Sequence, residues 1–434
     1  MTNYDPDVLA YLNKNARWNF TANFLDLTFY SLGLSFIFSS TVLSLYINHL
    51  YQNALLIGLI PAIQGVGYYF PQLFLARVAE RLPRKKPLTQ IISVMERFPY
   101  AIVGVTLLFW PQSPNWFAYA ILAFSLALAT FAGGLATPSW RGMLAKVVPV
   151  ERRGMLFGGS AALGGLLGVG GAALSRQILA QFPYPTSFGI CFMLCFVFQV
   201  CSWICLALNR EPAVQPTIAP RSARDYWKRL PTLLRQNTNY TRYLVARTLL
   251  ILGGMGSAFY VIYARRVFAT DDAFAANLTI AALVSMTISA PILGRLADKV
   301  GHKWLTELCT LVAICGVLLA LVAPSATWFY AVFVVITAAG AGFGIAGANM
   351  TMEFSAEELP TYTALADTLL AIPVLLSPII GGWLVDTIGF QPTFAIALAM
   401  YAIGWVVLHW LVHEPRFAHK RQPSSSSLTD EPNA

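Results

Sequence analysis

The segment Gly294-Arg-Leu-Ala-Asp298-Lys-Val-Gly301-His-Lys303 closes a long apolar stretch, and Ala76-Arg-Val-Ala-Glu80-Arg-Leu-Pro83-Arg-Lys85 closes an earlier one in the same way. The two copies lie 218 residues apart. A charged segment repeated after two apolar runs predicts that the chain holds two copies of one membrane-embedded unit. Such a duplication favours a protein that moves something across a bilayer.

Composition agrees with a membrane location. Hydrophobic residues make up 57% of the 434 residues and charged residues only 11%, whereas soluble domains carry about 25% charged residues. The mean hydropathy is +0.60. A spanning helix needs about 20 mainly apolar residues, and strand-like alternation is absent, so we expect an all-α integral membrane protein. The sequence predicts twelve spans, at 20–47, 54–78, 88–110, 116–138, 155–182, 186–208, 241–264, 273–297, 304–323, 327–350, 361–385 and 392–412.

The distribution of basic residues predicts the orientation of the chain. Most of the 29 Lys and Arg residues fall in the segments that share a side with the N-terminus. Because basic loops stay in the cytoplasm, we expect both termini there, in a multi-pass protein of the plasma or inner membrane. A basic inner face beside anionic lipid also explains the net charge of +9 without any nucleic-acid partner.

Two further matches support the duplication. Asn19 pairs with Asn239 at an offset of 220, and Gly170 pairs with Gly381 at an offset of 211, with the charged segments between them at 218. A falling offset is what small loop deletions produce. Six spans per copy is an even number, so we expect two six-helix bundles related by a pseudo-twofold axis along the membrane normal.

The span positions divide the chain into five parts. The linker is rich in proline and is predicted to hold a short amphipathic helix around 221–230, and the serine-rich end is predicted to be disordered. The expected parts are a cytoplasmic N-tail (1–19), an N-terminal bundle (20–208), a cytoplasmic linker (209–240), a C-terminal bundle (241–412) and a cytoplasmic tail (413–434).

Motifs for catalysis are missing from the sequence. It contains no phosphate-binding glycine loop, no H-E-x-x-H and no G-x-S-x-G. The six cysteines lie in the predicted sixth and ninth spans, where they are typical of small buried hydrophobic residues. We therefore expect no enzyme, no cofactor, no metal site and no disulfide.

The chain resembles transporters of the major facilitator superfamily. The resemblance covers nearly the whole chain, as 6+6 spans, a central loop and the loop signature G-x-L-a-D-r-x-G-r-[rk]. The first copy departs from the signature at Ala76, Glu80 and Pro83. The second copy matches it at Gly294, Leu296, Asp298, Lys299, Gly301, His302 and Lys303.

The resemblance implies that these loops gate the cytoplasmic side of the transporter. The alternative is an ordinary basic stop after a helix. The gating residues that the resemblance implies are Arg77, Glu80, Arg81 and Arg84 in the first copy, and Gly294, Asp298, Lys299, Gly301 and Lys303 in the second.

Five charged residues lie inside the predicted spans, at a depth of about 9 to 14 Å from the cytoplasmic ends. They are Asp26, Glu96, Arg97, Arg247 and Asp367. Charges at that depth suggest an ion or substrate path. Glu96 and Arg97 point about 100° apart on a helix, so we expect each to find a partner elsewhere, and we expect Arg97 to pair with Asp26. The open alternative is a static network that holds one bundle together.

Family resemblance also implies which spans line the cavity: the first, fourth, seventh and tenth. Asp26 and Arg247 are then candidates for contact with a substrate. Arg141 falls after the predicted fourth span, so that span lacks the arginine that many drug/proton antiporters carry. The remaining cavity candidates are Tyr30, Thr130, Tyr260, Tyr263 and Asn349.

The expected function is secondary active transport of a small organic solute by alternating access. Proton-coupled efflux ranks above uptake, on the strength of the aromatic interior and the carboxylates within the spans. The alternatives are a metabolite uptake symporter or facilitator and, in another class, a receptor with the same fold that does not transport. The expected partners are the solute, membrane lipids and protons, and the expected state is a monomer.

Overall fold

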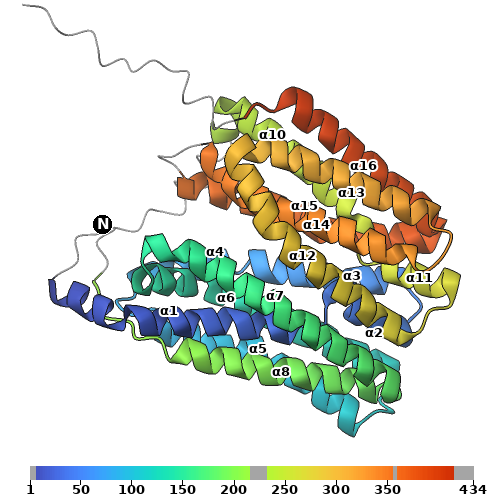
Figure 1. Cartoon of the computed structure of the whole chain (residues 1–434), viewed down its shortest axis with the longest axis horizontal. Coiled ribbons are helices and arrows are strands. Elements are labelled where there is room, and N and C mark those ends of the chain that lie inside the picture. Colours follow the sequence, from blue (N-terminus) through green and yellow to red (C-terminus); the bar gives the residue numbers. More distant parts are fainter. Residues whose placement is uncertain (1–5, 216–231, 355–358, 415–434) are drawn as a thin grey trace, which may run out of the picture.

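A computed structural model describes residues 6–215, 232–354 and 359–414, and within them the regular structure is helical (Figure 1). The all-α membrane fold is thereby confirmed. The first half contains α1 (Pro6–Ser35), the π-helical turn η1 (Ser39–Leu43), α2 (Ser44–Leu50), α3 (Ala54–Tyr69), α4 (Gln72–Arg81), α5 (Lys86–Phe109), α6 (Asn115–Val147), α7 (Val150–Gln181) and α8 (Thr186–Ala207). The second half contains α10 (Thr238–Gly253), the 3₁₀ turn η2 (Gly254–Gly256), α11 (Tyr260–Phe268), α12 (Asp272–Val300), α13 (His302–Val322), α14 (Trp328–Glu353), α15 (Leu359–Ile388) and α16 (Phe390–Leu411).

The helices account for the twelve predicted spans. Eleven stretches of the described residues are long and apolar enough to cross a membrane, and the shorter apolar helix α3 supplies the other. Helix α3 stops at Tyr69 and α4 continues the second span after Pro71, whose missing N–H breaks the helical hydrogen bonding. Some helices extend beyond the predicted spans. Helix α1 begins at Pro6, inside the predicted tail, and α6 runs to Val147, so Arg141 belongs to the fourth helix.

The first span of each half is broken at matching places. Helix α1 ends at Ser35 and resumes through η1 as α2, while α10 ends at Gly253 and resumes through η2 as α11. The two breaks are 218 residues apart, close to the offsets in the sequence. The repeat predicted from sequence therefore extends to irregular backbone, and this is the kind of broken helix that transporters place near a binding site.

At the end of the molecule where α1 begins, on the left in Figure 1, each half has the same asparagine contact. Asn19 on α1 accepts from the Arg210 N–H at 2.7 Å and donates to the Arg210 carbonyl at 3.1 Å. Asn239 on α10 accepts from the His413 N–H at 2.8 Å and donates to the His413 carbonyl at 2.9 Å. The Asn19–Asn239 match in the sequence therefore corresponds to the same pair of hydrogen bonds in each half.

The two halves meet along two helix pairs, α3 with α15 and α7 with α12. Hydrogen bonds between the halves gather toward the end remote from the termini, on the right in Figure 1. His49 lies 2.7 Å from Asp272, and Asp386 accepts hydrogen bonds from the N–H groups of Ala54 and Leu55, both at 2.8 Å. We refer to these contacts as the remote seam. They hold the halves together at one end of the molecule.

Candidate functional site

A polar cavity of about 240 Å³ lies inside the first half. Helices α1, α3, α5, α6 and α8 all contribute to its wall, so it sits at the centre of this bundle rather than on its outside. Its lining residues are Asp26, Leu27, Tyr30, Tyr68, Ser93, Glu96, Arg97, Gly133, Ala136, Thr137, Trp140 and Leu206.

Arg97 is the centre of the charged cluster in this cavity. Its side chain is 6% exposed, and it lies 3.6 Å from the Asp26 carboxylate and 2.9 Å from that of Glu96. The guanidinium also donates to the carbonyls of Gln199 and Ser93, at 3.0 and 3.2 Å. Each of its three nitrogens therefore has a partner, as a buried charge requires.

The two carboxylates are held by hydroxyl groups from neighbouring helices. Ser202 on α8 donates to Asp26 at 2.6 Å, and the Tyr30 hydroxyl on α1 donates to Glu96 at 2.9 Å. Glycine at position 133 leaves room for Glu96, because a Cβ there would be 2.9 Å from its Oε1. The carboxylates are thus positioned, and both share one guanidinium.

Helical spacing explains how the cluster assembles. Asp26 and Tyr30 are four residues apart on α1, and Ser93 and Arg97 are four apart on α5, so each pair lies on one face of its helix. The structure brings Asp26 and Arg97 together, in the pairing expected above. The expectation that Glu96 and Arg97 avoid each other was wrong. Both side chains are long and flexible enough to bridge the angle between them, and they bond at 2.9 Å.

Arg247 and Asp367 lie apart from this cluster, on α10 and α15 of the second half. Arg247 reaches the Phe343 carbonyl at 3.5 Å, and Asp367 is exposed. Asp367 interacts electrostatically with Arg141 of the first half. The five charges that sequence placed in one layer therefore form two groups, one within the first half and one between the halves.

The cavity candidates fall in different environments. Tyr30 lines the polar cavity, whereas Tyr260 and Tyr263 are 3% and 6% exposed and pack against Phe394 in the aromatic core of the second half. Thr130 bonds to the Leu126 carbonyl of its own helix at 2.8 Å. Asn349 likewise donates to the carbonyl four residues earlier, at 2.8 Å.

The two loop signatures differ in detail. Arg81 and Arg84 are exposed, and the side chains of Arg77 and Glu80 lie outside the described residues. In the second copy Gly294, Asp298 and Lys299 belong to α12, and the turn occurs at Gly301 alone, with φ +102°. Glycine adopts that conformation at little cost.

Acidic residues from elsewhere in each half hold the helices that follow these signatures. Glu211 accepts from the N–H groups of Lys85 and Lys86 at 2.8 and 2.7 Å, capping the start of α5. Glu414 accepts from the Lys303 N–H at 3.1 Å at the start of α13. Each glutamate precedes a proline in the sequence, and this repeated Glu-Pro pair is the signal that sequence reasoning missed.

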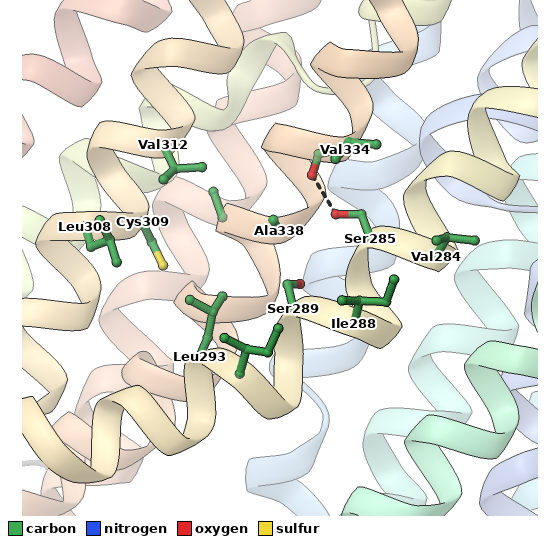
Figure 2. A pocket seen from close by; sticks show the side chains of 12 residues that line it. Val284, Ser285, Ile288, Ser289, Leu293, Leu308, Cys309, Val312, Val334 and Ala338 are labelled. Atoms are coloured by element: carbon green, nitrogen blue, oxygen red, sulfur yellow. Dashed lines mark hydrogen bonds between the residues drawn. The ribbon is translucent and has the colours of Figure 1, made fainter.

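A second pocket, of about 350 Å³, lies on the flank of the second half between α12, α13 and α14 (Figure 2). Its wall is almost wholly apolar. Ser285 donates to the Val334 carbonyl at 2.6 Å, and Ile288 and Ile292 are 58% and 57% exposed. It carries no charged lining residue, so the polar cavity is the better candidate for chemistry.

Comparison with known families identifies the family that has this fold. The model of the Major Facilitator Superfamily matches residues 25–270 and 243–431. The chain belongs to the major facilitator superfamily. It is therefore a membrane transport protein rather than an enzyme.

Comparison with individual superfamily members leaves the substrate open. The chain is 29% identical over 151 residues to the MFS-type transporter TOXA of Cochliobolus carbonum, a match that covers 34% of this chain and 27% of that protein. The nucleoside transporter NupG, solved as a mutant, has a TM-score of 0.69 at 14% identity, covering 89% of this chain and 99% of its own. A D-xylose-proton symporter has a TM-score of 0.68 at 16% identity, covering 92% and 98%. At these identities the two structures show the superfamily fold alone.

Several contacts of the site could not be found from sequence. Ser202 and Gln199 are on α8, far along the chain from Arg97, and nothing in their local sequence points to a charged partner. Asp386 and Asp272 at the remote seam were also missed. Both lie near span ends, where a charged residue is ordinarily solvated, and only tertiary packing brings them across the seam.

Proposed function

We propose that this chain is a proton-coupled secondary transporter of a small organic solute, with Asp26 and Glu96 as the proton-accepting groups. The observation that carries the proposal is the unequal charge of the buried cluster. Two carboxylates share the single guanidinium of Arg97. With all three groups ionised the cluster has a formal charge of −1, and one bound proton neutralises it. A buried charge is costly, so the cluster favours loading by a proton when no other cation is present.

The proposal also includes alternating access, in which the site opens to one side of the membrane at a time. The halves are joined at the remote seam through Asp272 and Asp386, and rocking about the central site would break these contacts while forming others at the opposite end. The bias of Lys and Arg supports cytoplasmic termini. With that orientation, the remote seam closes the outer side of the membrane.

The test is solute flux in proteoliposomes under an imposed pH gradient. Asp26→Asn and Glu96→Gln should each abolish acceleration by the gradient while leaving solute exchange intact, because the amides keep the shape but cannot bind the proton. Asp271→Asn is the matched control, since Asp271 caps α12 through the Phe274 N–H at 2.9 Å and asparagine caps equally well. Unchanged pH dependence in both site variants would remove the coupling.

The same vesicles separate the alternatives. A gradient that drives solute against the proton flow indicates efflux by antiport, which we rank first, and a gradient that drives solute with it indicates uptake by symport. Loss of flux for every solute in a broad panel, with ligand binding retained, would favour a receptor over a transporter.

A further inference from the structure

Arg247 has fewer hydrogen-bond partners than Arg97 of the polar cavity. It lies on α10 within a membrane span, partly buried. Its Nε is enclosed and has no hydrogen-bond partner. Within the described residues the guanidinium has one hydrogen-bond partner, the Phe343 carbonyl, at the limiting distance of 3.5 Å. Among the described residues no carboxylate lies within ion-pairing distance of it.

Arg97 shows how an arginine within a membrane span is fully hydrogen-bonded. It has two carboxylates and additional oxygen partners around all of its nitrogens. An uncompensated charge in a span costs free energy, so it persists where it has a use. The guanidinium of Arg247 therefore has N–H donors that the contacts described above do not use.

The surroundings of Arg247 carry positive charge. The guanidinium lies over Gly347 of α14, where a Cβ would come within 2.5 Å of one of its terminal nitrogens. Arg247, Arg141 and Asp367 all interact electrostatically with the hydroxyl of Tyr69 in the first half. Two guanidinium groups against one carboxylate give this region a formal charge of +1.

We propose that Arg247 recognises an anionic group of the transported solute, so that the substrate is an organic anion. A guanidinium presents paired N–H donors that match the oxygens of a carboxylate or phosphate. One such oxygen group would pair with the terminal nitrogens of the guanidinium and neutralise the excess charge. The inference rests on the proposed transport function and names the class of its substrate.

The two halves of the protein then have different roles in transport. Asp26 and Glu96 in the first half take the proton, and Arg247 in the second half takes the anion. Export of an anion and import of a proton both follow a membrane potential that is negative inside, so the pairing is energetically favourable for efflux.

The first experiment needs no knowledge of the ligand. Because Arg247 has no anionic partner in the unliganded protein, Arg247→Gln should melt at the same temperature as wild type or higher, while Arg97→Gln should melt lower. A structural arginine would behave in the opposite way. A clear drop in melting temperature for ligand-free Arg247→Gln would overturn the proposal.

The second experiment measures binding to the purified protein with charged and uncharged solutes of the same shape. Benzoate and succinate are compared with benzamide and succinamide, and inorganic phosphate tests the bare oxyanion. The anions should raise the melting temperature and the amides should not. Arg247→Gln should weaken anion binding by roughly tenfold to a hundredfold, and Arg247→Lys by less because the charge remains.

Arg242→Gln is the matched control, since this exposed arginine lies on the same helix and bonds only the Leu411 carbonyl at 3.3 Å. Gly347→Ala should also weaken anion binding, because the added methyl displaces the guanidinium. Transport of neutral or cationic solutes, unchanged in Arg247→Gln, would overturn the anion proposal and leave transport intact. Anion binding through Arg247 without flux of any solute would keep the recognition site and remove transport instead.

Discussion

The two halves of the transporter share the hydrogen bonds at their helix ends but differ in the charged residues of their interior. Asn19 and Asn239 make the same pair of backbone contacts, and Glu211 and Glu414 cap corresponding helices. The interior differs: the first half holds a fully hydrogen-bonded arginine at position 97, whereas the second half holds a poorly bonded arginine at position 247. Duplication therefore preserved the contacts that set helix ends, while the buried polar residues diverged between the halves.

The largest expected effect concerns the central arginine of the first half. Arg97→Gln leaves the Asp26 and Glu96 carboxylates buried without a cation, which should lower the free energy of unfolding by about 3 to 5 kcal/mol. Thermal melting of the purified protein checks this. Partial restoration of stability by the double variant Arg97→Gln, Asp26→Asn, which removes one of the two unpaired carboxylates, would attribute the loss to unpaired charge. An unchanged melting temperature in the single variant would show that the network is not structural.

A smaller effect should separate the two capping glutamates. Glu211 has a side chain that is 1% exposed and binds Lys146 at 2.6 Å in addition to its two N–H groups. Glu211→Ala should cost about 3 kcal/mol, and Glu414→Ala about 1 kcal/mol because it loses one cap contact. Parallel chemical or thermal unfolding of the two variants measures the difference. Equal losses would mean that the inner ends of the halves are energetically equivalent.

The smallest expected effect is a pH dependence at Glu414. Burial raises the pKa of this carboxyl, the Lys303 N–H opposes the rise, and the neighbouring Glu353 charge adds to it. The folded state then holds the proton more tightly than the unfolded state, so stability falls as pH rises from the ordinary carboxyl range through the raised pKa. Melting temperature against pH should therefore decline more for wild type than for Glu414→Gln. Coincident curves would contradict this assignment.

Sequence alone predicted the spans, because each needs a long apolar run that is visible locally, and it predicted the repeat through matches such as Asn19 with Asn239. It also placed Asp26 and Arg97 at compatible depths, where they meet. It could not place Tyr260 and Tyr263, since the same aromatic residue suits a cavity wall or a packed core. The outcome depends on neighbours from other helices.

Contacts between distant helices were the least accessible to sequence reasoning. Ser202 reaches Asp26 from the other end of the first half, and Asp386 reaches the start of α3 from the other half of the chain. Neither pairing follows from periodicity or hydropathy. Helix ends were missed for a related reason: α6 continues through Arg141 to Val147, past the point where its apolar character declines.

Asp386 has a consequence for how the molecule changes shape. Its carboxylate occupies the two first N–H groups of α3, and those groups have no other partner within their own helix. When the halves separate there, one anion and two amides lose their bonds together, and water is the replacement at hand. Water must therefore enter between α3 and α15 as the halves separate. The rate of the conformational change then depends on how readily water enters there.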